Sequence, residues 1–174
     1  EAERVKFARI PSLRPAFDRE GSVTAANASS INDGAAAVVV MAAEVAEAKG
    51  VKPLARIVAQ ASAAQAPEWF TTAPAKSIKK ALDKANLTTD DIDIYEINEA
   101  FAVVALANND LLGLDTDKVN LRGGAVALGH PIGASGTRIL VTLLHLLKDR
   151  GAKRGLASLC IGGGEAATLI VETV

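Results

Sequence analysis

The sequence has a single cysteine, Cys160, and two histidines, His130 and His145. One cysteine excludes an intramolecular disulfide, and it makes a reducing compartment, the cytoplasm, the expected location. The three side chains are far apart in the sequence and follow no recognised spacing of metal ligands. We therefore expect neither a disulfide nor a metal ion.

Aromatic residues are also scarce, at 3% of the chain, although 49% of all residues are hydrophobic. A packed core is expected, and alanine, valine, isoleucine and leucine must build it. Lysine and arginine total 19 against 20 aspartates and glutamates, so without a basic surplus no nucleic acid is expected as a partner. The longest apolar run, residues 34–43, is shorter than the ~20 residues that cross a bilayer, so no membrane is expected either.

The first 50 residues have a different pattern from the rest. Residues 1–30 contain Pro11 and Pro15, which predicts extended or loop structure, and they begin as if the chain were entered midway through a fold. An Ala/Val-rich segment follows. It is predicted to be a helix that Asp33 caps and Gly50 ends.

From residue 55 onward, strand and helix signals alternate. This alternation predicts an α/β fold, a sheet covered by helices, and the short link between the last two strands predicts that they are antiparallel. Ser135 is expected to cap the last helix, and the helix over 99–112 is apolar enough to be buried. The expected strands are 55–62, 92–97, 156–160 and 167–171, and the expected helices are 74–86, 99–112 and 135–150.

The sequence Asn-Glu-Ala-Phe-Ala at residues 98–102 lies where a predicted strand ends and a predicted helix begins. One interpretation is structural, with Asn98 capping the helix. The other is functional, because α/β sheets bind ligands at the carboxyl ends of their strands. An amide at that place could hold a water molecule or a carbonyl oxygen.

A glycine-rich segment, residues 123–136, surrounds His130. Pro131 disfavours the α conformation at His130, so the imidazole is expected on an extended loop. The neighbouring glycines allow a backbone or a ligand to approach closely, and the N-terminus of a helix lies directly behind. Single loop histidines are often structural, but this density of glycine favours a site.

Cys160 ends a predicted strand and is followed by three glycines, residues 162–164. It could be a small buried hydrophobic residue. Alternatively it is a functional thiol, with the N–H groups of the following glycines available to a developing oxyanion. An amide, an imidazole and a thiol at such positions together suit acyl or enolate chemistry.

At these three motifs the sequence resembles the thiolase family. Asn-Glu-Ala-Phe at 98–101, Gly-His-Pro-Ile-Gly-Ala-Ser-Gly at 129–136 and Cys-Ile-Gly-Gly-Gly at 160–164 are similar to the three late motifs of that family, in order. The resemblance implies the thiolase fold, specifically the C-terminal half of a layered α-β-α-β-α arrangement with a mixed sheet. It divides the chain into the tail of a loop domain (1–31), the last segment of the N-terminal half-fold (32–52) and the C-terminal domain (53–174).

The resemblance also implies roles for four residues. Cys160 looks like the acid/base cysteine that moves the proton on the thioester α-carbon. His130 looks like the residue that activates the nucleophile and donates to the thioester oxygen. Asn98 looks like the holder of a water molecule in the same oxyanion hole, and Gly162 like the backbone donor of a second hole.

Three further residues, Ser29, Ala25 and Phe101, are expected by resemblance to line the pantetheine channel. The implied activity is the condensation of two acetyl-CoA molecules to acetoacetyl-CoA and its reversal, with CoA thioesters as substrates and no other cofactor. Because Cys160 is the only cysteine, an N-terminal half that carries the nucleophilic cysteine is expected as a partner. The chain alone is expected to be inactive, and the complete protein to be a homo-oligomer, a dimer or tetramer.

Other functions stay open. Residues 66–74 are similar to the short-chain, acetoacetyl-forming branch, which favours it over a broad-chain 3-ketoacyl-CoA thiolase of fatty-acid β-oxidation. A ketoacyl synthase is disfavoured, because that relative has histidine where Asn98 stands. A non-catalytic acyl-CoA-binding fragment is the alternative from another class, and the presence of all three motif residues argues against it.

Overall fold

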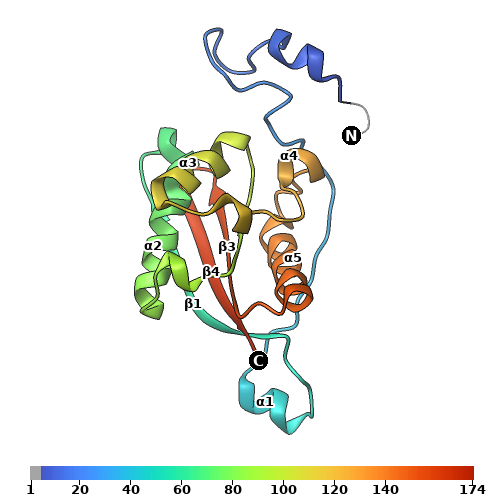
Figure 1. Cartoon of the computed structure of the whole chain (residues 1–174), viewed down its shortest axis with the longest axis vertical. Helices are drawn as coiled ribbons and strands as arrows, with labels where there is room; N and C mark the ends of the chain where they lie inside the picture. Colours follow the sequence, from blue (N-terminus) through green and yellow to red (C-terminus); the bar gives the residue numbers. More distant parts are fainter. Residues whose placement is uncertain (1–4) are drawn as a thin grey trace.

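The computed structural model of the chain describes residues 5–174, so residues 1–4 of the expected loop-domain tail lie outside the described part. Its strands are β1 (Ala55–Ala64), β2 (Ile94–Ile97), β3 (Arg154–Ile161) and β4 (Glu165–Thr173). They form one mixed sheet in the order β1-β4-β3-β2 (Figure 1). β2 and β3 are parallel, and β4 is antiparallel to β1 and β3. The predicted α/β class and the antiparallel pairing of the last two strands are confirmed.

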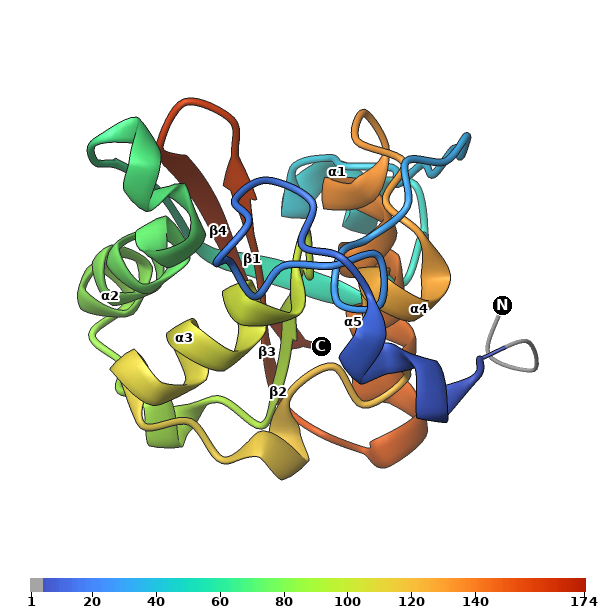
Figure 2. The same cartoon turned by 90° about the horizontal axis from the view of Figure 1, so that it is seen from above.

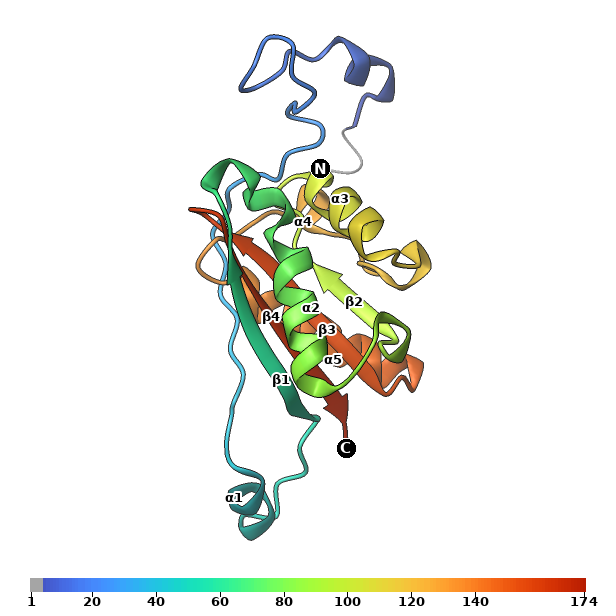
Figure 3. The ribbon, with the colours of Figure 1, turned by 90° about the vertical axis from the view of Figure 1, so that its left-hand side faces the viewer.

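Helices cover both faces of this sheet. α2 (Ala73–Ala85) packs on β1 and β4, and α5 (Ser135–Arg150) packs on β2 and β3 from the opposite side (Figure 3). α3 (Ala102–Leu112) lies on the same side of the sheet as α2 (Figure 1). Two short α-helices, α1 (Ala43–Ala48) and α4 (Ala125–Leu128), and the 3₁₀ turns Phe7–Ser12, Pro67–Thr72, Thr89–Asp91 and Thr116–Lys118 complete the elements.

The hydrophobic core consists of two clusters on opposite faces of the sheet, and successive residues of a strand contribute to them alternately. In β2, Tyr95 and Ile97 join the hydrophobic cluster beneath α2, whereas Ile94 joins the cluster beneath α5. This alternation is the two-residue period of a strand. On α5 the buried residues Ile139 and Leu143 are one helical repeat apart and face the sheet as a stripe.

The predicted helix over the Ala/Val-rich segment is largely wrong. Residues 32–42 are extended, and only Ala43–Ala48 is helical. The residue before this helix is Ala42, and no side chain caps it, so Asp33 is not a cap. The β-branched run 38–40 explains the difference, because valine loses rotamer freedom in a helix and suits extended backbone. The extended segment leads from the upper end of the molecule down to α1 (Figure 1).

Two other helix predictions need correction. α3 begins at Ala102 rather than at residue 99, and it buries Val104, Ala105 and Asn108 while Leu106 remains 66% exposed. Ser135 is the first residue of α5 and not its cap, which is Ala134. Residues 5–31 lie over the end of the sheet near the start of α3 and near α4 (Figure 2). Within residues 5–174 no helix is long and apolar enough to span a membrane.

Exposed apolar side chains lie on α3 and on the extended segment. α3 exposes Val103, Leu106 and Leu111, whereas α5 has no large hydrophobic residue among the exposed ones in the described chain. In the extended segment, Val39 is 86% and Val40 69% exposed. Soluble monomers rarely leave such side chains contiguous and uncovered.

We predict that the 174-residue chain self-associates and binds a hydrophobic dye through this segment. The double substitution Val39→Lys and Val40→Lys should lower both signals, because charge at these positions prevents burial against a second copy. Light scattering and dye fluorescence measure the two effects. Val174→Lys, a matched change at another exposed valine, should alter neither, and a monomeric, dye-free parent chain would contradict the prediction.

Candidate active site

Asn98 and Cys160 lie at the same edge of the sheet because β2 and β3 run parallel. Ile97 pairs with Ser158, and the Asn98 backbone N–H donates to the Ser158 carbonyl at 2.9 Å. Cys160 is two residues further along β3. Both candidate residues are buried, with 1% of Asn98 and 8% of Cys160 exposed. This is the carboxyl edge, where α/β sheets place their ligand sites.

The structure brings His130 to Asn98. The Asn98 Nδ2 atom is 3.5 Å from His130 Nε2, and His130 Nδ1 is 2.6 Å from the Ser135 hydroxyl oxygen. The Asn98 amide nitrogen can only donate, so Nε2 accepts from it and the neutral ring carries its proton on Nδ1; Ser135 accepts from Nδ1 and donates to the Pro131 carbonyl at 3.1 Å. Nε2 of the neutral ring then carries a lone pair facing the Asn98 amide. Asn98 does not cap α3, whose first flanking residue is Phe101, so the capping interpretation is wrong.

The backbone around His130 is fixed on both sides. Its N–H donates to the Ser30 carbonyl at 2.8 Å, and residue 31 forms a parallel bridge with it. Gly129 has φ 93°, and a Cβ there would overlap the side-chain amide of Asn32, so only glycine fits. The glycine that precedes the histidine is therefore required by the close passage of residues 30–32.

Glu99 ties the segment before His130 to the end of β2. Its carboxylate accepts from Asn120 Nδ2 and from the Val126 backbone N–H, both at 3.3 Å. A Cβ on Gly124 would overlap this carboxylate, which explains that glycine. Asn120, at φ 51°, exchanges two 2.8 Å hydrogen bonds with the backbone of Ile97 through its side chain. Neither Glu99 nor Asn120 was recognised from sequence, although Glu99 adjoins Asn98 within the first motif.

Burial lowers the pKa of His130 below its ordinary value, and the nearby positive charge of Arg138 lowers it further. The imidazole is therefore kept neutral at physiological pH, as a proton acceptor requires. Burial raises the pKa of the Cys160 thiol in this chain. Cys160 packs in the apolar cluster with Ile97 and Leu156, where a thiolate is poorly solvated.

Gly162 lies in the turn between β3 and β4. The two following glycines adopt φ 96° and 93°, and a Cβ on Gly164 would overlap the Gln65 carbonyl. Gly162 has open space on the side where a Cβ would point, and it is exposed. Its backbone is thus accessible beside Cys160, and its role as an oxyanion donor stays a prediction.

The three predicted channel residues have different surroundings. Ser29 donates to the Ala100 carbonyl from both its N–H and its hydroxyl, at 3.0 and 2.8 Å. Phe101 contacts Phe17 and Phe70 edge to face, with ring centroids 5.8 and 6.2 Å apart. Ser29 and Phe101 therefore meet at the start of α3. Ala25 lies in an exposed turn, and the channel role of all three stays a prediction.

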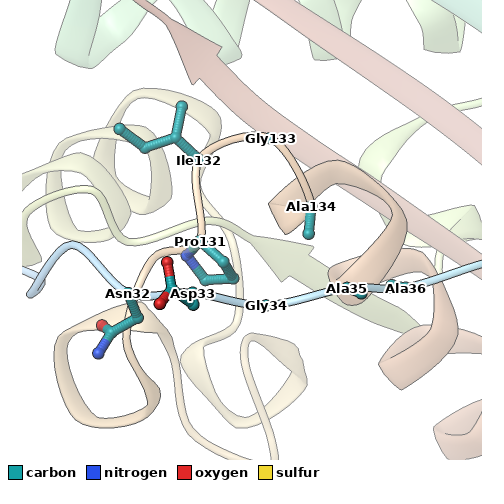
Figure 4. A pocket seen from close by; sticks show the side chains of 9 residues that line it. All are labelled: Asn32, Asp33, Gly34, Ala35, Ala36, Pro131, Ile132, Gly133 and Ala134. Carbon is teal, nitrogen blue, oxygen red and sulfur yellow. The ribbon is translucent and has the colours of Figure 1, made fainter.

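A pocket of about 320 Å³ lies behind the His130 loop, between residues 32–36 and residues 131–134 (Figure 4). Its lining contains none of the candidate catalytic side chains, so it is a neighbour of the site and not the site itself. Across the described residues 5–174, no group of three or more His, Cys, Asp or Glu side chains is arranged to hold a metal ion.

Comparison with known proteins agrees with these motifs. The family model described as "Thiolase, C-terminal domain" matches residues 51–173, and "Thiolase, N-terminal domain" matches residues 1–44. The chain belongs to the thiolase family. The predicted division at residues 31 and 52 stays a prediction.

The relatives are whole enzymes of greater length. The chain is 54% identical over 172 residues to a probable acetyl-CoA acetyltransferase of Dictyostelium discoideum, covering 99% of this chain and 42% of that protein. It is 59% identical over 163 residues to an acetyl-CoA acetyltransferase of Cupriavidus necator, covering 94% and 42%. The chain thus spans 42% of the length of these two curated relatives.

Solved structures confirm the thiolase fold. The Bacillus anthracis acetyl-CoA acetyltransferase superposes with a TM-score of 0.95 at 47% identity, covering 98% of this chain and 43% of that one. Human mitochondrial 3-ketoacyl-CoA thiolase in complex with CoA superposes with a TM-score of 0.91 at 39% identity, with the same coverage.

The raised pKa of Cys160 has a measurable consequence. A smaller thiolate fraction at pH 7 should make alkylation of the chain by iodoacetamide slower than that of a free cysteine, because the thiolate is the nucleophile. The rate should keep rising above the pH at which an ordinary thiol is fully ionised, and mass spectrometry can follow it. Cys160→Ser should not react, and rapid alkylation that reaches its plateau below pH 8 would contradict the assignment.

Proposed function

We propose that the chain is the C-terminal part of an acyltransferase that acts on CoA thioesters. It would condense two acetyl-CoA molecules to acetoacetyl-CoA and catalyse the reverse thiolysis. The observation that carries this proposal is the Asn98–His130–Ser135 hydrogen-bonded chain at the carboxyl edge that also holds Cys160. The names of the relatives, acetyl-CoA acetyltransferase in plants, animals and bacteria, support the same reaction.

His130 would serve the first half-reaction. Its Nε2 lone pair accepts the proton of a nucleophilic thiol, and the sulfur attacks the acyl carbon of acetyl-CoA. The bond from that carbon to the CoA sulfur breaks, and the imidazolium returns the proton to the departing sulfur. While protonated, Nε2–H can donate to the thioester oxygen together with a water held by Asn98, which lowers the energy of the developing oxyanion.

Cys160 would serve the second half-reaction. As a thiolate it removes a methyl proton from a second acetyl-CoA, and the resulting carbanion attacks the acyl carbon of the acyl-enzyme. The carbon–sulfur bond to the enzyme breaks, acetoacetyl-CoA leaves, and the freed enzyme thiolate takes the proton from Cys160. Gly162 would donate its N–H to the oxyanion of one of these steps. Burial opposes the Cys160 thiolate in this chain, so the complete site must supply further stabilisation.

The partner that this mechanism requires is an N-terminal half with a second cysteine. Cys160 is the sole thiol of the chain and cannot be both nucleophile and α-proton base. We propose that the half-fold stacks on such a partner in the complete protein, and that the complete protein is a homo-oligomer in the cytoplasm. Ser29, Ala25 and Phe101 would line the pantetheine channel.

A broad-chain 3-ketoacyl-CoA thiolase remains the second candidate. The likeness to human mitochondrial 3-ketoacyl-CoA thiolase supports it at 41% identity, which is less than the 47% identity to the acetyl-CoA acetyltransferase structure. Comparing turnover of acetoacetyl-CoA with that of a long-chain 3-ketoacyl-CoA separates the two. A non-catalytic acyl-CoA-binding fragment would bind CoA and leave both substrates unchanged.

The two half-reactions can be separated by mutation in the complete protein. Cys160→Ala should abolish condensation and solvent deuterium exchange at the acetyl methyl, because general base catalysis is worth about 10²–10⁴-fold. Acetyl loading of the other cysteine should persist, since it needs no α-proton removal. His130→Ala should impair both steps, and the 174-residue chain alone, lacking a nucleophile, should not turn over. Full methyl exchange in Cys160→Ala would remove Cys160 from the mechanism.

A further inference from the structure

A buried ion pair lies directly beneath the candidate active site and takes no part in the chemistry proposed above. Glu96 is 1% exposed, and its Oε2 atom is 3.9 Å from Nη1 of Arg138. The Arg138 side chain is 21% exposed. The pair connects β2 to α5, which are the two elements that carry Asn98 and Ser135.

The positions of the two residues follow from the periods of their elements. Glu96 precedes Asn98 by two residues, so both point to the α5 side of β2. Arg138 follows Ser135 by three residues, so both lie on one side of α5. Together with His130, the side chains close a ring that runs from Asn98 through His130 and Ser135 down α5 to Arg138, across to Glu96, and back along β2.

The Glu96–Arg138 pair is poorly suited to stabilising the fold. Glu96 Oε1, Asn98 Oδ1 and Arg138 Nη1 are buried, and none has a hydrogen-bond partner among the described residues. Buried polar atoms without partners are costly, and an apolar pair of similar volume often stabilises a fold at least as well. A geometric role for the charges therefore explains their presence better than stability does.

Electrostatics also link the pair to His130. Burial is the larger cause of the lowered pKa of His130, and the positive charge of Arg138 is the second. Burial raises the pKa of Glu96 to about 7, and the charges that act on this carboxyl are Arg138 on α5, Glu99 after β2 and Arg122 before α4. Arg138 thus faces both the carboxylate and the imidazole, and its placement affects each.

We propose that Glu96 and Arg138 are the positioning pair of this site: their contact fixes the first turn of α5 against the end of β2 and keeps the His130 ring aligned with Asn98. The inference rests on the proposed function only in regarding His130 as the reacting base. Its test is spectroscopic, so loss of the proposed activity and loss of alignment are observed separately.

The experiment is ¹H–¹⁵N NMR of the histidine rings in the 174-residue chain. His145, exposed in the same helix, is the internal reference. Asp149→Asn, which breaks the exposed pair between Asp149 near the end of α5 and Arg122 before α4, is the matched control variant and should leave His130 unchanged. Thermal unfolding of each variant reports stability independently.

Three substitutions separate the effect of the Arg138 charge from the effect of the Glu96–Arg138 contact on the position of the His130 ring. Glu96→Gln should broaden the Nδ1–H signal of His130 by solvent exchange, because Arg138 loses its anchor. Arg138→Gln should broaden the signal and also raise the pKa of His130, since the repelling charge is gone. Arg138→Lys keeps the charge but loses the planar guanidinium, so the signal should broaden while the pKa stays low.

A purely stabilising role predicts otherwise. If Glu96→Gln and Arg138→Gln lowered only the unfolding midpoint and kept the sharp Nδ1–H signal and parent titration of His130, the proposal would be overturned. Should either single variant fail to fold, the double variant Glu96→Met and Arg138→Met retains an apolar contact at the same place. A broadened Nδ1–H signal and a raised His130 pKa in that folded double variant support the proposal, and a parent-like ring overturns it.

Discussion

The parallel pairing of β2 with β3 is the constraint on which the rest of the site depends. It places the residues after Ile97 and Ser158 at one edge, although about 60 positions separate them in the chain. Asn98 is locked there by a backbone hydrogen bond to β3, and Cys160 follows on the neighbouring strand. Without this register, the amide and the thiol would not lie at the same edge of the sheet, and the His130 loop would have no fixed partner.

The His130 loop is then attached to that edge by contacts that are individually modest. Asn120 extends the hydrogen bonding of β2 on its free side, Glu99 holds Val126, and Ser135 orients the ring. Each contact begins on the segment between β2 and α5 or on α5 itself. The loop is therefore tied to the same stretch of sheet that places Asn98, and its His130 N–H is held on the other side by the Ser30 carbonyl.

Local sequence patterns were sufficient to predict most of the helices and strands. Period-two and period-3.6 patterns predicted the strands β1 to β4 and the helices α2 and α5. The motif residues Asn98, His130 and Cys160 were identified because their residue types and glycine neighbours indicate chemistry. Where the helix pattern failed, the alanine content had concealed a local signal. Residues 32–42 are extended, and the β-branched run 38–40 favours extended backbone over helix.

The environment of the site was the least predictable part. No local sequence pattern around Cys160 shows that burial among Ile97 and Leu156 raises the pKa of its thiol. Pairing of Glu96 with Arg138 depends on which faces of β2 and α5 meet, and no local pattern encodes that. Burial favours the uncharged forms of Cys160, His130 and Glu96 alike. The site therefore lies at an edge of the sheet where the effective dielectric constant is low. There the guanidinium of Arg138 is the main charge that shifts the pKa of His130.

The most direct test of this account is the protonation state of His130 in the unaltered chain. Long-range ¹H–¹⁵N NMR across a pH titration distinguishes a protonated Nδ1 from a protonated Nε2 in the neutral ring. The hydrogen bonds to Ser135 and Asn98 predict the proton on Nδ1, a bare Nε2, and a pKa below the ordinary value of 6.5. A proton on Nε2, or titration of His130 at or above the ordinary value of 6.5, would contradict it.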